Sequence, residues 1–287
     1  MLWGFFKKVV VADNCALFVN GVFENYQTLD GSTLFLGAFF FTIQIYGDFS
    51  GYSDIAIGCA RLFGIDLMQN FKYPYFSRDI AEFWRRWHIS LTTWFRDYIY
   101  IPLGGSRAGK WKSFRNTLVI FLVSGFWHGA NWTFVAWGAY HALLFLPLLL
   151  LGQNRRYRDS VAENSFLPSV KELTQMGVTF LLVLLGWILF RSEDISQAAV
   201  YLERMFNASL FSAPQLVGLG FGQLLLKKCF FFTALMFIVE WIGRKQAHGL
   251  MIEDLSLPVR YVIYTVLLII IYGFDASNPQ GFIYFQF

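Results

Sequence analysis

The chain has 287 residues, of which 56% are hydrophobic, 20% aromatic and only 15% charged. Soluble domains are closer to a quarter charged, so this composition excludes an ordinary soluble domain and predicts a polytopic α-helical membrane protein. The net charge of +4 is small, and its cations are scattered beside apolar segments. That pattern argues against a nucleic-acid partner and fits the excess of Lys and Arg in cytoplasmic loops of membrane proteins.

The sequence contains no internal repeat, low-complexity tract or soluble-domain boundary. We therefore expect one helical membrane domain over residues 1–287, with short, broken and interfacial helices around a central chamber. The length of a membrane span predicts about six hydrophobic elements.

The first apolar stretch, residues 3–19, is amphipathic because Lys7, Lys8, Asp13 and Asn14 interrupt it. It fits either the membrane interface or the inside of a bundle. Residues 21–32 are expected to form a polar connection.

Residues 33–64 form an apolar run that carries Asp48 and Asp54. Its length predicts one long broken span or two short ones, with a break near Gly47 or Gly51. Carboxylates within such a run normally face a bundle interior or a wet cavity. Two interpretations follow: the two aspartates pair with nearby cations or cap helix ends, or they bind substrate in a reaction chamber.

Residues 81–100 are predicted to form one amphipathic helix, with Asp79 or Ser77 as its N-cap. Its spacing places His88 on the same face as Trp84 and Leu91. The loop that follows, SRAGKWKSFRN, is basic and has no acid, so we expect it on the cytoplasmic side. The GGSRAGK segment lacks Walker A spacing. It either steers a polyanionic cofactor such as coenzyme A or is simply solvated.

Residues 116–126 and 132–151 are apolar on both sides of the segment WHGAN. They predict either two helices joined by a tight turn or one kinked element. Further spans are expected near residues 176–190, 230–242 and 259–272, and residues 191–223 are expected to form a re-entrant or surface loop. The C-terminal GFDASNPQGFIYFQF resembles an interfacial anchor.

His128 is the strongest candidate for chemistry. It follows Trp127 and precedes a glycine, and its ordinary pKa near neutrality suits a general base for a hydroxyl. The alternative is a buried histidine satisfied within the bundle. Trp127 and Asn131, its neighbours in the same segment, are candidate substrate-binding residues.

Two other histidines are weaker candidates. His88 is suited to orienting a substrate, or else to a plain interfacial position. His141 follows His128 by 13 residues, which in an unbroken helix means about 20 Å of rise and roughly 140° of rotation. We therefore interpret His141 as structural. The chain shows no HExxH-type spacing, and its cysteines are remote from its histidines, so we expect neither a metal site nor a bound cofactor.

Three segments together resemble the membrane-bound O-acyltransferase family, in particular its bacterial branch of alginate O-acetylation and teichoic acid D-alanylation proteins. They are IQIYGDFSGYSDIAIG (residues 43–58), FWRRWHISLTTWFRDYIYIPLGG (83–105) and FWHGANWTFVAWGAYH (126–141). The resemblance implies an acyltransferase in which His128 matches the family histidine and His88 the second catalytic position. Members of this branch usually carry several more spans ahead of this segment, so we expect an N-terminally truncated member.

The resemblance also implies the substrates, the partner protein and the location of the enzyme. The donor would be acetyl-CoA or a similar thioester from the cytoplasm. The acceptor would be an exported polysaccharide, reached directly or through a periplasmic acetyl-accepting or SGNH-type transferase partner. The expected location is the bacterial inner membrane, with several passes through the lipid bilayer.

Two other functions stay open from the residues. Intramembrane aspartates and histidines also suit an acyl-group conduit or transporter subunit that hands the group to a separate periplasmic transferase. A non-catalytic scaffold subunit is a third interpretation.

Overall fold

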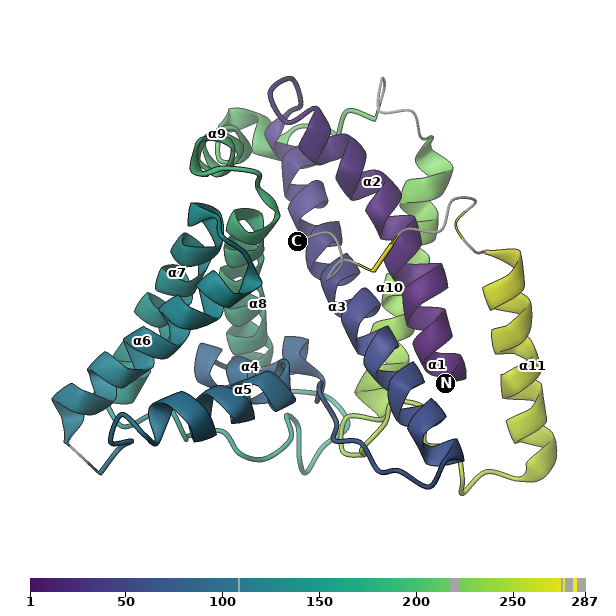
Figure 1. The fold of residues 1–287 in the computed structure, drawn as a ribbon. Helices are drawn as coiled ribbons and strands as arrows, with labels where there is room; N and C mark the ends of the chain where they lie inside the picture. The colour runs from purple at the N-terminus through teal and green to yellow at the C-terminus, as the bar shows by residue number, and fades with distance from the viewer. Residues whose placement is uncertain (108, 217–221, 275, 277–280, 283–287) are drawn as a thin grey trace. The chain divides into compact units, whose positions relative to one another are not determined.

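The computed structural model describes residues 1–107, 109–216, 222–274, 276 and 281–282. All regular elements in these ranges are helical (Figure 1), which confirms the predicted all-α class. The chain divides into two compact units, which are described separately. Unit 1 comprises Met1–Gln69 with Val200–Phe287, and unit 2 comprises Asn70–Ala199. The single domain and its central chamber remain predictions.

Unit 1 begins with a continuous helical stretch that contains a π-helical segment and packs along a second long helix (Figure 1). Lys7 and Lys8 lie in the π-helical segment and are buried, so the first stretch lies inside a bundle rather than at an interface. The helices of this unit are α1 (Leu2–Phe5), η1 (Phe6–Ala12), α2 (Asp13–Glu24), α3 (Gly31–Leu62), η4 (Ala208–Phe211), α10 (Gln223–Ile242) and α11 (Leu257–Gly273).

Helix α3 is unbroken over 32 residues, so the predicted break near Gly47 or Gly51 is wrong. The two glycines serve close packing instead. A Cβ atom on Gly51 would lie 2.8 Å from the carbonyl oxygen of Gly4, and one on Gly47 would lie 3.1 Å from that of Lys7. At these two positions α3 lies directly against the backbone of the first helical stretch.

Unit 2 begins with short helices and ends with three long ones. They are η2 (Pro74–Phe76), α4 (Ile80–Arg86), α5 (Ile89–Phe95), η3 (Arg96–Tyr100), α6 (Lys110–His128), α7 (Trp132–Leu150) and α8 (Val170–Arg191). The prediction of one helix over residues 81–100 is wrong, because the chain leaves the helical conformation at Trp87 and His88. Asp79 caps α4 as predicted, since its side chain accepts a hydrogen bond of 2.7 Å from the Glu82 N–H.

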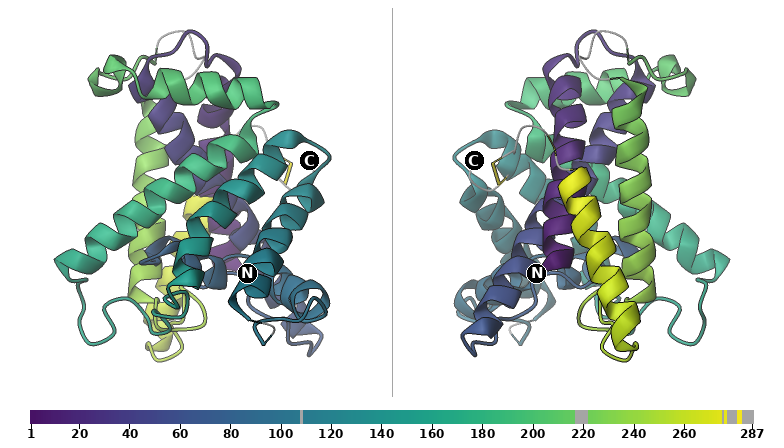
Figure 2. Two further views of the ribbon diagram at one scale, coloured as in Figure 1. Left: turned by 90° about the vertical axis from the view of Figure 1, so that its left-hand side faces the viewer. Right: turned by 90° about the vertical axis from the view of Figure 1, so that its right-hand side faces the viewer.

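The segment WHGAN joins two separate helices, the first of the two predicted alternatives. Helices α6 and α7 pack closely side by side, with α8 beside α7 (Figures 1 and 2). Helices α8, α10 and α11 cover the remaining predicted spans. The predicted loop over residues 191–223 contains a further helix, α9 (Ile195–Met205), which crosses the boundary between the units. Most of the predicted C-terminal anchor lies outside the described residues.

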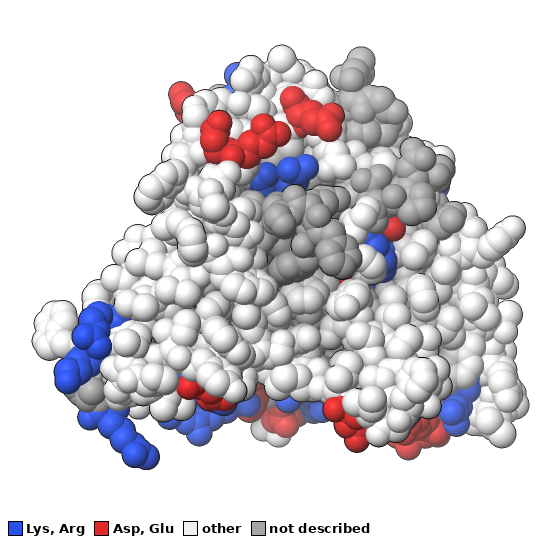
Figure 3. Space-filling model, in the orientation of Figure 1, with Lys and Arg blue, Asp and Glu red and all other residues white. Residues whose placement is uncertain are grey.

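Two of the described helices, α7 and α8, are long and apolar enough to cross a membrane. Their most apolar 18-residue stretches have mean hydropathies of 1.7 and 2.0. α11 is apolar but shorter. Large apolar side chains such as Leu143 and Val178 are more than half exposed on α7 and α8, as a surface facing lipid requires. Figure 3 shows Lys and Arg side chains gathered where α6 begins, whereas α6 carries no Lys, Arg, Asp or Glu after Arg115. The number of membrane passes remains a prediction.

Candidate functional site

The site begins with the hairpin of α6 and α7, whose close approach depends on two glycines. A Cβ atom on Gly125 would lie 2.2 Å from the carbonyl oxygen of Phe134, and one on Gly138 would lie 2.2 Å from that of Phe121. No side chain fits at either position. The hairpin therefore places the last turn of α6, which ends in His128, directly against the first turns of α7.

Asn131 shapes the turn between these helices. Its side chain accepts a hydrogen bond of 3.1 Å from the Thr133 N–H and so caps α7. Its amide group also donates to the carbonyl oxygen of Glu193, at 2.7 Å. The amide that the sequence proposed for substrate binding thus holds α7 to the segment after α8. Its role toward substrate remains a prediction.

His128 lies in a cage of aromatic rings from three helices. Its ring centroid lies 5.0 Å from that of Trp127, 5.2 Å from that of Trp137 on α7 and 5.0 Å from that of Phe190 on α8. Trp137 and Phe190 are nearly fully buried, whereas Trp127 is 52% exposed. The imidazole is therefore enclosed by apolar rings on most sides and lies beside one exposed indole.

His88 comes to the same place from the other end of unit 2. Its ring centroid lies 6.3 Å from that of Trp127, so this indole is in contact with both imidazoles. The structure thus brings together His88, Trp127 and His128, three of the residues proposed from the sequence. A neighbouring pair of imidazoles provides two groups that can each accept or donate a proton.

The backbone of His88 is left-handed, with φ 44° and ψ 57°. Such a conformation is uncommon for a residue with a side chain and persists only where neighbours hold it, often at functional sites. Here Asn70 holds it: its carbonyl oxygen accepts from the Ile89 N–H at 3.0 Å, and its side chain accepts from the Ser90 N–H at 3.1 Å. Burial lowers the pKa of His88 from 6.5 to about 4, so this imidazole is neutral at pH 7.

A buried ion-pair network anchors α4, the helix that precedes His88. The Glu82 carboxylate is 1% exposed and accepts hydrogen bonds from the guanidinium groups of Arg78 and Arg86, the shortest at 2.7 Å. Arg78 extends the network to the Asp159 side chain at 3.0 Å and to Glu172 at 3.5 Å. The network fixes α4 against the connection between α7 and α8 and so sets the start of the turn that carries His88.

His141 is fully buried beneath the cage. Its ring centroid lies 4.9 Å from that of Trp84 and 5.2 Å from that of Trp137, and neither ring nitrogen has a hydrogen-bond partner among the described residues. The break at Gly129 brings His141 closer to His128 than one helix would allow, but Trp137 lies between the two rings. The interpretation of His141 as structural remains a prediction.

Asp48 and Asp54 lie in unit 1, where both pair with lysines of η1. The Asp48 carboxylate is 2.6 Å from Lys8 Nζ, and that of Asp54 is 2.8 Å from Lys7 Nζ. These contacts match the first of the two interpretations drawn from the sequence. Substrate binding by the two aspartates remains a prediction.

The rest of this ionic cluster was not identified from the sequence. Asp13 pairs with Lys8 at 2.8 Å, and the buried Glu240 accepts a hydrogen bond from the Tyr46 hydroxyl. The signal in the sequence is the pair of lysines inside an apolar stretch, because a buried cation needs a carboxylate partner.

Trp137 and Phe190 were also not singled out from the sequence. In a chain with 10 Trp and 33 Phe, an aromatic residue carries little information by itself. Only the packing of α4, α7 and α8 shows which rings surround the histidines.

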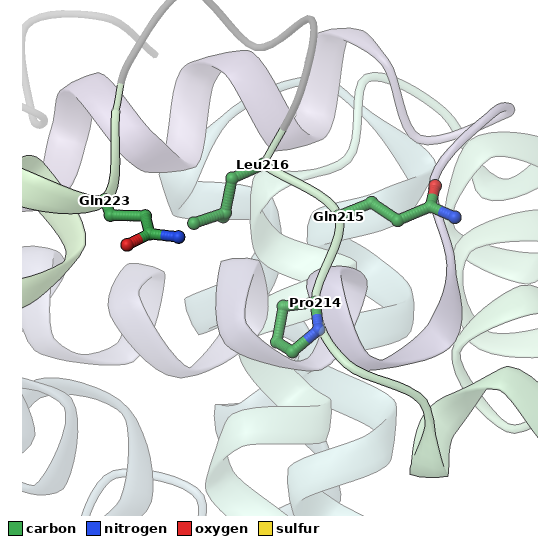
Figure 4. Close-up of a pocket in the computed structure, with 4 residues that line it drawn as sticks. All are labelled: Pro214, Gln215, Leu216 and Gln223. Atoms are coloured by element: carbon green, nitrogen blue, oxygen red, sulfur yellow. The ribbon is translucent and has the colours of Figure 1, made fainter.

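Two other observations limit the choice of site. The described residues contain no group of three or more His, Cys, Asp or Glu side chains arranged to hold a metal. A pocket of about 480 Å³ in unit 1 is lined by Pro214, Gln215, Leu216 and Gln223. Figure 4 shows the Gln223 amide directed toward Leu216 and the Gln215 amide directed away from it. None of these side chains titrates, so this pocket offers no acid or base.

The chain matches known proteins over most of its described length. The model of the MBOAT, membrane-bound O-acyltransferase family, matches residues 19–160. "Probable alginate O-acetylase AlgI" of Pseudomonas aeruginosa is 42% identical over 228 residues, which cover 78% of this chain and 42% of the relative. The peptidoglycan O-acetyltransferase of Helicobacter pylori is 39% identical over 202 residues, covering 70% of this chain and 37% of the relative.

A more distant relative is the teichoic acid D-alanyltransferase of Bacillus subtilis, 29% identical over 202 residues, covering 66% of this chain and 49% of the relative. The chain therefore spans less than half the length of these curated relatives. The matched residues 19–160 include both His88 and His128.

Proposed function

Because this chain belongs to the membrane-bound O-acyltransferase family, we propose that it moves an acetyl group from a thioester donor to a hydroxyl of an exported polysaccharide. Two of the relatives are named for O-acetyl transfer, one of them to alginate and the other to peptidoglycan. The single observation that supports this proposal best is the enclosure of His128 by aromatic rings, one of which, Trp127, also contacts His88.

In this proposal the neutral imidazole of His128 accepts the proton of the acceptor hydroxyl as its oxygen attacks the thioester carbonyl. The tetrahedral intermediate then collapses, the C–S bond breaks, and the imidazolium returns its proton to the departing thiolate. Trp137 and Phe190 exclude water from one side of the imidazole, which disfavours hydrolysis of the donor.

His88 has a second role in the same proposal. As a neutral imidazole it can donate a hydrogen bond from one nitrogen to the thioester oxygen, or hold the acceptor hydroxyl toward His128. Its left-handed backbone fixes the direction of the side chain before substrate arrives. Trp127, which is exposed and contacts both imidazoles, and Asn131 in the adjoining turn are the proposed substrate contacts.

The partners and location follow from the same premise. We propose a place in the bacterial inner membrane, with acetyl-CoA or a similar thioester as the donor. A periplasmic acetyl-accepting or SGNH-type transferase would receive the group where the polysaccharide is not acetylated directly.

The test is the His128→Ala variant in the full polypeptide as the cell makes it, with acetylation of the exported polymer as the readout. We expect transfer to fall by about 10²-fold or more, the typical contribution of a general base, with unchanged membrane insertion. His248→Ala is the matched control, because His248 lies in unit 1 and is not one of the rings around His128. Undiminished acetylation in His128→Ala would refute the assignment.

A second candidate, the acyl-group conduit, is favoured by the buried cluster around Lys7 and Lys8, since buried ionisable groups in membrane proteins often form relays. Purified, reconstituted protein with labelled acetyl-CoA and an acceptor oligosaccharide separates the two functions. A transferase forms acetylated product by itself. A conduit forms product only after a periplasmic transferase is added.

A further inference from the structure

A second pocket, which lies in unit 2, is lined by cations from separate parts of the chain. It has a volume of about 360 Å³ and lies between α4 and the connection that joins α7 to α8. The lining side chains carry five positive charges and no carboxylate. They are Lys72, Arg85, Arg86, Arg155 and Arg158, together with the hydroxyl-bearing Tyr157 and Ser160.

Two of the five cations are already held by the protein. Arg86 donates to Glu82 at 2.7 Å, and Arg85 donates to the carbonyl oxygens of Asn154 and Tyr157. Arg85 therefore shapes the connection, because it holds the main chain on both sides of residue 155. Arg85 and Arg86 are therefore fixed in the lining by hydrogen bonds to the protein itself.

The other three cations have no counterion. Lys72, Arg155 and Arg158 form no ion pair with any residue that the structure describes, and all three are exposed. Three carboxylates near the lining are already engaged: Glu82 accepts from Arg78 and Arg86, Asp159 from Arg78, and Glu163 from the Ser160 N–H. Of the five cations of the pocket, only Arg86 has an ion-pair partner among the described residues.

Like charges crowd one another in this pocket. Burial lowers the pKa of the Arg85 guanidinium, and the positive charges of Arg86 and Arg158 lower it further, against the opposing effect of Asp79 and Glu82. Cations that repel one another across a cavity of this size are stabilised by an anion placed between them.

The chemistry of the lining indicates which anion. Guanidinium groups match the oxygens of a phosphate with paired hydrogen bonds, and a lysine and hydroxyl groups add further donors. We propose that this pocket binds a phosphate-bearing group.

The position of the pocket leaves two sources for that group. It lies at the ends of α7 and α8, the two helices suited to cross a bilayer, where residues 151–169 join them. A phospholipid headgroup and the phosphates of a soluble thioester donor both reach such a position. The second source rests on the proposed function, whereas phosphate binding itself does not.

The experiment replaces the two arginines of the connection that line the pocket. The Arg155→Gln/Arg158→Gln variant is compared with Arg156→Gln/Lys171→Gln, which removes the same charge from an exposed arginine of the connection and a lysine at the start of α8, both outside the pocket lining. Both are made in the full polypeptide and purified in a neutral detergent, and equal melting temperatures establish that both are folded. The probes are coenzyme A, pantetheine, which has no phosphate, and short-chain phosphatidylglycerol.

If the donor supplies the phosphate, the Arg155/Arg158 variant binds coenzyme A roughly tenfold or more weakly than wild type, while pantetheine binding and the control variant are unchanged. If a lipid supplies it, the same loss is seen for phosphatidylglycerol and not for coenzyme A. Equal affinities of wild type and the Arg155/Arg158 variant for both phosphate-bearing probes would overturn the proposal. Acyl transfer is not measured, so this outcome is independent of the His128→Ala result.

Discussion

His128 and Trp137 meet edge to face, with their ring centroids 5.2 Å apart and their planes at 89°. One residue ends α6 and the other lies on the facing side of α7. The contact exists only because glycines at the crossing let the two helix backbones approach. The proposed base is therefore positioned by a helix crossing rather than by its own helix alone.

The first prediction concerns that crossing. In Gly138→Ala the new Cβ atom would lie 2.2 Å from the Phe121 carbonyl oxygen, which is backbone and cannot move without separating the helices. We expect a fall of several degrees or more in the melting temperature in detergent, together with loss of acetyl transfer. Gly177→Ala on α8 is the matched control, because nothing lies within 4 Å of its new Cβ atom. Equal melting temperatures of the two variants would show that the crossing tolerates a methyl group.

The second prediction concerns the ion pairs that hold α4. Glu82→Gln leaves the buried guanidinium groups of Arg78 and Arg86 without their shared carboxylate. Breaking a buried charge pair typically costs about 3–5 kcal/mol, so we expect marked destabilisation measured by thermal unfolding. Asp97→Asn removes the partner of the exposed Arg96 and should leave the melting temperature nearly unchanged, because water screens this pair. A Glu82→Gln protein as stable as Asp97→Asn would contradict the anchoring role of Glu82.

The third prediction concerns pH. The pKa of His88 is about 4 in the folded protein, against 6.5 for the free side chain, so the unfolded chain binds the proton more readily. Stability should therefore decrease as the pH falls from about 6.5 to about 4, and the loss should be complete below that range. His88→Gln cannot take up this proton. We expect the melting temperature of wild type to fall more than that of His88→Gln between pH 7 and pH 4, and parallel curves would exclude the effect.

The fourth prediction distinguishes the two interpretations of Asp48. The carboxylate lies 2.6 Å from the buried Lys8 Nζ, so Asp48→Asn weakens the pairing of a cation that is removed from water. We expect lower thermal stability with little change in the KM for the acceptor. The triple variant Asp13→Asn/Asp48→Asn/Lys8→Met should recover part of that stability, since it removes Lys8 together with both of its carboxylate partners. An increased KM at unchanged stability would instead indicate that Asp48 binds substrate.

Features that depend only on neighbouring residues were predicted correctly. The cap at Asp79 follows from a short polar side chain before a helical pattern, and the two helices around WHGAN follow from apolar runs on both sides of a glycine. The breaks were less predictable. Gly47 and Gly51 were taken as interruptions, although glycine inside a helix also permits close packing, and only the neighbouring backbone distinguishes these uses.

The break at His88 was missed for the opposite reason. The sequence around it has helical periodicity and contains neither Gly nor Pro between Ile80 and Ile101. The turn is imposed from outside by Asn70, whose hydrogen bonds hold Ile89 and Ser90. A contact between residues about 20 positions apart leaves no mark on the local pattern.

The basic loop after α5 gives a third case. The segment SRAGKWKSFRN runs into the first turns of α6, and His128 is the last residue of that helix. From Lys110 to His128 the helix advances by 18 residues, which is a rise of about 27 Å. The basic segment and the proposed base therefore lie at opposite ends of one helix.

The sequence by itself determined the class of this protein, its family and the histidine most suited to act as a base, because composition, motif order and residue chemistry are properties of the chain. Only the tertiary structure decided that His88 and His128 contact the same indole and that Asp48 and Asp54 pair with lysines. It also decided that Lys72, two cations of α4 and two of a distant connection line one pocket. These relationships depend on which helices touch. That outcome is set by packing across the whole unit, and no local stretch of sequence encodes it.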